Sequence, residues 1–220
     1  MDKTDYLKYV YAKPDKLLVE HCLETGWTAY EYLTNGFYKG QVNLLAKDLH
    51  VETETLVNNM CFFTADHDVG KAHPIFQSIN MPNPGTEMLT KLGLIDKKPL
   101  PDRYVFRHEQ YSGILIEEYI ERKLTKTKTP HRDAMDYGNL VSSHHQGKKK
   151  NIISDITGFP SEDKWKEKII NPLFETIEKE FPFTEIDLTG NVDRFFHFTL
   201  GLIILCDRIA SSSDLTEEEE

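Results

Sequence analysis

The sequence predicts an all-α fold, a compact helical domain with any functional site set between helices. Apolar residues recur at helical spacing along most of the 220 residues. No run of alternating apolar and polar residues bounded by hairpin turns stands out, so strands are expected to be minor. Turn-forming residues divide the periodic segments: Asn35-Gly36 ends the first helix, and a long irregular connection is marked by Pro82, Pro84, Gly85, Pro99 and Pro101.

Seven helices are expected in chain order. They cover residues 15–34, 41–50, 53–65, 108–124, 132–143, 161–181 and 191–211. The sixth begins at Ser161, a plausible N-cap that is followed by Glu162 and Asp163, where the helix dipole favours negative charge. The seventh contains the longest apolar stretch, residues 195–206.

Size and composition are those of an ordinary globular protein. A chain of 220 residues buries roughly 70 to 75% of its unfolded surface and needs no disulfide to fold. Hydrophobic residues at 39% and charged residues at 28% argue against a repetitive or largely disordered chain. Cys22, Cys61 and Cys206 lie far apart, and we expect them to be buried rather than paired or zinc-binding. The domain is expected to span residues 1–213, with 214–220 forming an acidic, frayed tail or the start of a linker.

No membrane span is expected. The stretch 195–206 contains His197 and Thr199, and it is shorter than the roughly 18 apolar residues that a span requires. The N-terminus lacks a basic region followed by an apolar core, which a secretory signal would have. A cytoplasmic location is the default expectation.

The charge is unevenly distributed. The net charge of −10 argues against a nonspecific nucleic-acid coat protein. Residues 122–150, however, contain eight basic and two acidic residues, which makes this segment +6. Charge alone leaves two interpretations open, a solvated loop surface or an anion-binding segment.

Histidines predict a metal site. A single histidine is more often a satisfied surface or core residue than a ligand, but several fall at positions that could converge. These are His21 in the first helix, His67 followed by Asp68, His108 at the start of a helix, and the pair His144-His145. Imidazole and carboxylate together suit divalent transition metals, and adjacent ligands at a helix end can reach one ion or two neighbouring ions.

Asp207 is an independent clue. It follows Leu202-Ile203-Ile204-Leu205-Cys206 in a helix that is apolar on nearly every face. A buried carboxylate must be compensated, by a metal ion or by a basic side chain. The alternative to a metal is a salt bridge to Arg208 or Arg194 at the helix surface.

The order of these residues resembles a known family. His21, His67-Asp68 and Asp207 are similar to the pattern of the HD superfamily of helical metal-dependent phosphohydrolases, in which four such residues hold one metal. His108 and His144-His145 match its extended pattern, in which a second metal is bound and the motif aspartate, here Asp68, bridges the pair.

A narrower resemblance covers residues 21–211. It is to the HD nuclease part of the helicase-nuclease of type I CRISPR systems, and it consists of separated elements in the same order. The matching segments are His67-Asp68-Val69-Gly70-Lys71 continuing to Phe76-Gln77, Arg107-His108-Glu109 with Ser112, and Asp207-Arg208-Ile209-Ala210-Ser211.

The resemblance implies a role for each site residue. His21, His67, Asp68 and Asp207 would hold one metal, and Asp68, His108, His144 and His145 the second. Two ions about 3.5 to 4 Å apart can clamp a phosphodiester and activate water, so no protein nucleophile is needed. Lys71 would neutralise a phosphate, although its sequence position also fits an exposed helix-end lysine. Ser211 could donate a hydrogen bond to a phosphate, although serines are common at helix ends. His50, His73, His131 and His197 are left to structural roles.

The implied substrate is single-stranded DNA, cut internally and from its ends during antiviral CRISPR interference. On this view residues 122–150 guide the strand toward the metals, with Lys148, Lys149 and Lys150 contacting phosphates. The sequence contains no Gly-x-x-x-x-Gly-Lys-Ser/Thr loop, so no ATP site is expected in it. The implied partners are therefore a helicase domain or subunit and, through it, the RNA-guided surveillance complex. The chain is expected to be a stand-alone nuclease subunit or, preferably, an N-terminal fragment of a helicase-nuclease.

Three alternatives stay open at this point. HD-type cyclic-dinucleotide phosphodiesterases share the two-metal pattern, but they carry an acidic residue and a Gly-Tyr-Pro element where Gln146-Gly147 and three lysines follow the histidine pair here. A nucleotide phosphohydrolase would need the four-residue site alone. A noncatalytic binding module or acidic inhibitor is compatible with the net charge of −10. Among metals, five imidazole ligands favour manganese, nickel or cobalt for the isolated chain, with iron and zinc also compatible, and magnesium, which prefers oxygen, is also associated with the family.

Overall fold

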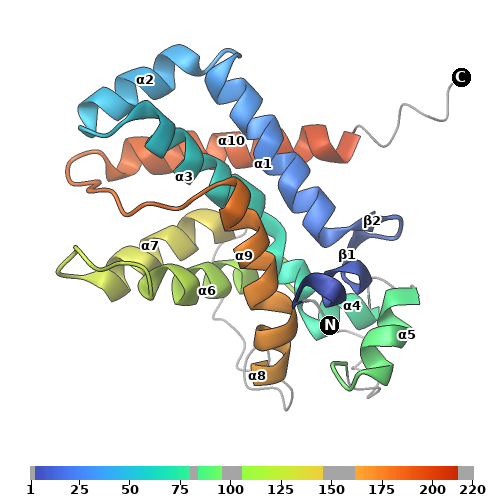
Figure 1. The fold of residues 1–220 in the computed structure, drawn as a ribbon. Helices are drawn as coiled ribbons and strands as arrows, with labels where there is room; N and C mark the ends of the chain where they lie inside the picture. Colours follow the sequence, from blue (N-terminus) through green and yellow to red (C-terminus); the bar gives the residue numbers. More distant parts are fainter. Residues whose placement is uncertain (1–2, 80–83, 96–105, 146–161, 213–220) are drawn as a thin grey trace, which may run out of the picture.

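The computed structural model describes residues 3–79, 84–95, 106–145 and 162–212, and these are predominantly helical (Figure 1). The N-terminal elements are η1 (Lys3–Tyr9), β1 (Tyr11–Lys13), β2 (Lys16–Leu17), α1 (Leu18–Thr34), α2 (Lys39–Asp48), α3 (Thr53–Ala65) and η2 (Asp66–Ala72). They are followed by α4 (Pro74–Ile79), α5 (Pro84–Lys91), α6 (His108–Glu121), α7 (Pro130–Ser142), α8 (Glu162–Trp165), η3 (Lys166–Ile170), α9 (Asn171–Glu180) and α10 (Val192–Ser212).

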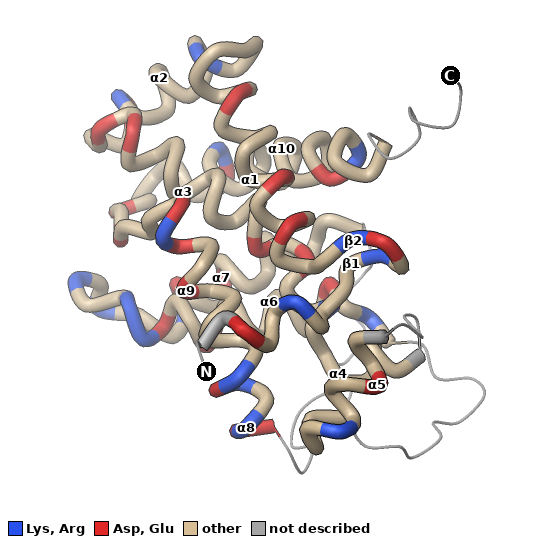
Figure 2. Tube along the Cα trace, turned by 45° about the vertical axis from the view of Figure 1, so that its right-hand side comes forward, with Lys and Arg blue, Asp and Glu red and all other residues tan. Residues whose placement is uncertain are grey.

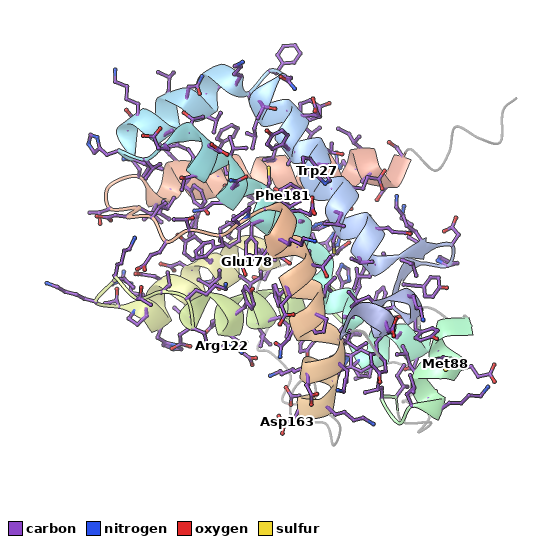
Figure 3. All side chains as sticks on the ribbon, in the orientation of Figure 1. Trp27, Met88, Arg122, Asp163, Glu178 and Phe181 are labelled. Carbon is purple, nitrogen blue, oxygen red and sulfur yellow. The ribbon has the colours of Figure 1, made fainter. Side chains whose placement is uncertain are left out.

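Helices α1, α3 and α10 form the centre of the molecule. Helix α3 is buried along nearly its whole C-terminal half, from Asn59 to Ala65. Helix α1 packs closely on it because Gly26 has no side chain: a Cβ there would lie 2.4 Å from Cε2 of Phe181 and 3.0 Å from Cβ of Ala65. Phe181 also packs edge-on against Trp27 of α1, with ring centroids 5.1 Å apart (Figure 3).

Helices α6 and α7 form an antiparallel pair (Figure 1), and Tyr137 of α7 stacks on Phe63 of α3 with ring centroids 4.8 Å apart. Gly113 of α6 and Gly138 of α7 face each other at their crossing, where a Cβ on either residue would lie 2.6 Å from the carbonyl oxygen of the other. The loop between the helices is fastened by Glu185, whose carboxylate accepts hydrogen bonds from three consecutive backbone N–H groups, those of residues 125–127. This close pairing sets the start of α6 beside the end of α7.

Helices α8 and α9 are joined by a π-helical turn, η3, into one continuous element. Pro172 explains the turn, because proline cannot donate a backbone hydrogen bond and its ring crowds the carbonyl of residue 168. The N–H of Asn171 instead reaches back five residues to the carbonyl of Lys166. Phe174 of this element stacks on Tyr119 of α6 with ring centroids 4.2 Å apart.

The helical prediction is confirmed for the fold as a whole, and several details need correction. The first helix begins at Leu18 rather than at residue 15, because Pro14 and Asp15 form the turn between β1 and β2. The connection expected to be irregular around residues 82–101 contains helix α5. The helix expected over 161–181 is interrupted by η3, and its proposed N-cap Ser161 lies outside the described residues.

Helix α10 is long and apolar enough to cross a membrane by length and composition. Core helices of globular proteins pass the same test, and α10 packs against α1, α3 and α7. It buries Phe195, Leu202 and Cys206 in the hydrophobic core. The three cysteines are buried and unpaired, as predicted.

Candidate metal centre

Five segments meet at one place and bring the predicted residues together. The first turn of α1 supplies His21, η2 supplies His67 and Asp68, and α6 begins with His108. His144 and His145 follow the end of α7, and Asp207 lies near the end of α10. In the described residues these side chains form two groups with ligand geometry, in each of which the potential ligand atoms lie within 4.8 Å of one another. The two groups share Asp68.

Asp68 divides its two carboxylate oxygens between the groups. Its Oδ2 lies 3.0 Å from Nε2 of His21 and 3.3 Å from Nε2 of His67. Its Oδ1 lies 3.1 Å from Nε2 of His108 and 3.7 Å from Nε2 of His144. A carboxylate placed in this way can hold two neighbouring ions, one on each oxygen.

The first cluster consists of His21, His67, Asp68 and Asp207. Oδ1 of Asp207 lies 3.6 Å from Nε2 of His21 and 3.5 Å from Nε2 of His67. The two histidines are fully buried, whereas the Asp207 side chain is 24% exposed. This cluster is therefore closed toward the protein core and open on the α10 side.

The second cluster consists of Asp68, His108, His144 and His145. The Nε2 atoms of His108 and His145 lie 3.1 Å apart. His144 is buried, His108 is half-buried and His145 is exposed, so this cluster faces solvent.

Backbone carbonyls fix the orientation of two imidazole rings. Nδ1 of His67 lies 2.8 Å from the carbonyl oxygen of Thr64, and Nδ1 of His144 lies 2.6 Å from that of Val141. A carbonyl can only accept, so Nδ1 carries the proton in both rings and donates it. Nε2 of each ring is then the nitrogen directed at Asp68, which is the arrangement of metal-ligating histidines.

The close approach of η2 to α6 depends on Gly70. A Cβ at this position would lie 2.0 Å from the carbonyl oxygen of His108 and 2.6 Å from the nitrogen of Ser112. The backbone N–H of Gly70 donates a 2.8 Å hydrogen bond to Oγ of Ser112. Glycine at this position therefore allows Asp68 and His108 to belong to one site.

The electrostatics of the site are dominated by its two carboxylates. Burial acts to lower the pKa of His67, but Asp68 and Asp207 raise it to about 10. Burial acts to raise the pKa of Asp207, but its contact with His67 holds that pKa at about 2. Against the effect of burial, His67 and Lys71 likewise hold the pKa of Asp68 well below its ordinary value. Both carboxylates are therefore ionised at neutral pH, and they make the site attractive to cations.

The residues present fit divalent metal ions. Nε2 of His67, Nε2 of His144 and Oδ1 of Asp68 are buried. They face other ligand candidates, but none of them makes a hydrogen bond of good geometry among the described residues. Buried polar atoms of this kind are costly unless something binds them. Burial, together with the neighbouring His144 and His108, lowers the pKa of His145, which keeps its imidazole neutral as a ligand must be. Three imidazoles and one carboxylate, or two of each, are donor sets that transition metals accept.

Lys71 and Ser211 both lie at the site. The Lys71 side chain is only 15% exposed, and its Nζ lies 2.6 Å from Oδ2 of Asp68, so it is not an exposed helix-end lysine. Oγ of Ser211 lies 3.3 Å from Oδ1 of Asp207, one turn earlier on α10. The alternative salt bridge from Asp207 to Arg194 is not formed, because Arg194 pairs with Asp48. Lys148, Lys149 and Lys150 lie outside the described residues.

Three features of the site were not recognised from the sequence. The ring-orienting carbonyls of Thr64 and Val141 follow a local rule, since each lies three residues before the histidine that it holds. Asp66 is buried beside His67 without a hydrogen-bond partner in the described part of the chain, and burial raises its pKa well above the ordinary value. The β1–β2 hairpin also lies near the site, and Pro14-Asp15 is a turn signal that could have indicated it.

Comparisons with known proteins agree with this geometry. A solved structure described as the crystal structure of a CRISPR-associated protein superposes with a TM-score of 0.74 at 18% sequence identity. The match covers 99% of this chain and 24% of the other, so this chain spans about a quarter of that protein's length. No curated protein matches the sequence. Residues 10–216 match the family model described as Cas3, HD domain, and the chain therefore belongs to the family of Cas3 HD domains.

Proposed function

We propose that this chain is a metal-dependent phosphodiesterase that degrades single-stranded DNA in type I CRISPR interference. The observation that carries the proposal is the division of the Asp68 oxygens between two clusters, with His21 and His67 on one side and His108 and His144 on the other. Membership of the Cas3 HD domain family supports a metal-dependent hydrolase that acts on nucleic acid.

The chain's residues have distinct tasks in this proposal. His21, His67, Asp68 and Asp207 hold one divalent ion, and Asp68, His108, His144 and His145 hold the other. The bound ions supply Lewis-acid activation of water and stabilisation of the charge that develops on the phosphate. Lys71 and Ser211 orient the phosphodiester from the open side, because they border Asp68 and Asp207 and can reach its oxygens. The buried imidazoles of His21 and His67 exclude water from the closed side.

The second cluster distinguishes this proposal from a nucleotide phosphohydrolase, which would need the first cluster alone. Nε2 of His108 and Nε2 of His145 lie 3.1 Å apart beside Asp68, although one residue begins α6 and the other follows the end of α7. A site that used the first cluster alone would not need this convergence. The cyclic-dinucleotide alternative is disfavoured by Gln146-Gly147 and the lysines that follow the histidine pair.

Manganese, nickel or cobalt are the proposed ions for the isolated chain, since five imidazoles contribute to the two clusters. The proposed partners are a helicase domain or subunit and the RNA-guided surveillance complex, which would deliver the displaced strand. ATP is not required for the cutting step itself.

The deciding experiment uses circular single-stranded DNA, because a circle excludes trimming from ends by contaminants. Metal-stripped protein is incubated with the circle and manganese, without ATP, beside Asp68→Ala. We expect cutting by the wild type that needs manganese and is abolished in the variant, because Asp68 belongs to both clusters.

A matched pair of histidine variants tests the second cluster. His145→Ala removes an exposed ligand candidate and should lower cutting at least about tenfold. His197→Ala removes an exposed histidine whose Nδ1 lies 2.7 Å from the carbonyl of Asp193, outside both clusters, and should leave cutting unchanged. Intact circles after incubation with folded, metal-loaded wild type would refute the nuclease proposal, and cyclic dinucleotides would be the next substrate.

A further inference from the structure

The β1–β2 hairpin extends two lysines to the end of α10, next to the candidate metal centre. Nζ of Lys13 donates a hydrogen bond to the carbonyl of Ser211, and Nζ of Lys16 donates one to the carbonyl of Ala210, both over 3.4 Å. In Figure 2 strands β1 and β2 show basic positions on both sides of an acidic turn, and the contacts with α10 are the two hydrogen bonds just given.

The end of α10 has a local excess of negative charge. The last carbonyls of a helix carry the negative end of its dipole, and here they lie one turn beyond the Asp207 carboxylate. Asp68 adds a second carboxylate nearby. Its Oδ2 lies 3.0 Å from the same His21 that Asp207 contacts, and Lys71, whose Nζ lies 2.6 Å from that oxygen, offsets its charge. A phosphate that approached along α10 would still meet Asp207 and the last carbonyls of the helix, whose negative charge opposes its approach unless further cations lie there.

We propose that Lys13 and Lys16 form a phosphate-binding site, which holds the backbone of a nucleic-acid strand next to the phosphodiester at the metal centre. This inference rests on the proposed function, and it adds a binding element for the strand outside the residues matched to the family motif. Contacts connect it to the metal centre: Lys13 contacts Ser211, and Oγ of Ser211 contacts Oδ1 of Asp207. Ammonium groups in such a place contact consecutive phosphates regardless of base sequence.

Gln77 fixes the position of the hairpin relative to the metal centre. Its side chain is fully buried, and its Oε1 accepts a 3.1 Å hydrogen bond from the N–H of Tyr11. Its Nε2 donates to the carbonyl of Tyr11 over 2.8 Å and to the carbonyl of Lys71 over 2.7 Å. One amide group therefore joins strand β1, two residues before Lys13, to the segment that carries Lys71. Gln77 is thus a positioning residue for both lysines.

Lys16 is held from a second direction. It forms an ion pair with Glu24 on α1, one turn after His21, in addition to its contact with Ala210. The hairpin is therefore fastened to α1, to α10 and to η2, the three elements that build the first cluster. A strand bound to it would have a fixed position relative to Asp207.

The test measures DNA binding in the absence of metal, so that it does not depend on catalysis. Fluorescence anisotropy of a labelled single-stranded oligonucleotide is recorded over a range of salt concentrations for wild type, Lys13→Gln, Lys16→Gln and the double variant. Each phosphate contact to a single strand contributes about 0.7 to the slope of log K against log salt, so the double variant should lower the slope by about 1.4. Lys47→Gln, which changes an exposed lysine on α2, is the matched control and should bind as the wild type does.

Two further measurements separate this inference from the proposed function. Hydrolysis of bis(p-nitrophenyl) phosphate, which is too small to reach the hairpin and the metals together, should keep its kcat/KM in the double variant, while KM for single-stranded DNA rises. Lys13→Arg keeps the positive charge, so it should bind the oligonucleotide as tightly as the wild type does, unlike Lys13→Gln. If the wild type hydrolyses neither substrate, the proposed function fails. The anisotropy measurement still shows whether Lys13 and Lys16 bind phosphates.

An unchanged salt slope in the folded double variant overturns the inference. A lower Tm with an unchanged slope does so as well, because it shows that the lysines only cap the carbonyls of α10. Gln77→Leu should reproduce part of the loss of binding when Lys13 and Lys16 are intact, and wild-type binding by this folded variant overturns the positioning role.

Discussion

Replacement of Gly138 by alanine should remove one metal ion and leave the other. Gly138 lies where α7 crosses α6, and a Cβ there would be 2.6 Å from the carbonyl oxygen of Gly113 and 3.2 Å from Cβ of Glu117. Because the first of these atoms belongs to a helix backbone, no side-chain rotation relieves the clash. The two helices have to move apart, and they carry His108 on one side and His144 and His145 on the other.

The size of the effect follows from the same distances. Ordinary van der Waals contact begins at 3.4 Å, so the helices must separate by about 0.8 Å, the difference between 3.4 and 2.6 Å. Overpacking of this kind costs about 1 to 3 kcal/mol. Alanine regains about 1 kcal/mol of helix propensity over glycine, which leaves a net destabilisation of about 0 to 2 kcal/mol. Tm should therefore fall by at most about 8 °C in a domain of this size. A displacement near 1 Å at the second cluster should weaken its metal affinity by about 10- to 100-fold.

Equilibrium dialysis against manganese, followed by elemental analysis, measures the number of bound ions. We expect two per wild-type chain and one per Gly138→Ala chain, because the first cluster is built from α1, η2 and α10 and does not use α7. The control is Gly201→Ala on α10, where a Cβ would meet nothing within 4 Å. This variant should bind two ions and be more stable by about 0.5 to 1 kcal/mol. Two tightly bound ions in folded Gly138→Ala, or loss of both ions, would refute the assignment of the clusters to separate helix pairs.

Other substitutions test the packing around the site. Ser112→Ala leaves the buried N–H of Gly70 without its acceptor and should destabilise the protein by about 1 to 3 kcal/mol in chemical denaturation; a wild-type unfolding midpoint would contradict the role of this hydrogen bond. Phe63→Ala removes a fully buried ring whose centroid lies 4.8 Å from that of Tyr137. The free energy of unfolding, measured by the same method, should fall by about 3 to 5 kcal/mol. A loss below about 1 kcal/mol would mean that this contact is not part of the core. Glu185→Gln should lower Tm at pH 7. Burial acts to raise the pKa of Glu185, but three backbone N–H groups together hold it below its ordinary value of 4.5. The stabilisation is therefore present above that pH and is lost as the pH falls. The Tm difference from wild type should therefore shrink in acid, and a constant difference between pH 7 and pH 3 would exclude the ionised carboxylate as its cause.

The helices could be predicted because their signals are local. Periodic apolar residues and breakers such as Asn35-Gly36 act within a few residues, and α3 was placed at its observed bounds, residues 53–65. The hairpin was missed because β1 and β2 have only three and two residues, too few for an alternating pattern. The π-helical turn before Pro172 was also missed, since the periodic pattern of the segment continues through it.

The sequence by itself determined which residue types are available for metal chemistry and in what order they occur. His67-Asp68 at the end of one helix and His144-His145 at the end of another are local features, and a family resemblance joined them to His21, His108 and Asp207.

The resemblance implies the division of these residues into two clusters, but only the tertiary structure decided how the division is built. The division depends on the direction of each Asp68 oxygen, which is set by packing of η2 between α1 and α6. That packing requires glycine at position 70, and the approach of His144 and His145 to His108 requires glycines at the α6–α7 crossing, since the backbones there are too close for a side chain. The place of Lys13 and Lys16 beside α10 is likewise a contact over nearly 200 residues of sequence, made by the folded chain and not encoded in any local pattern.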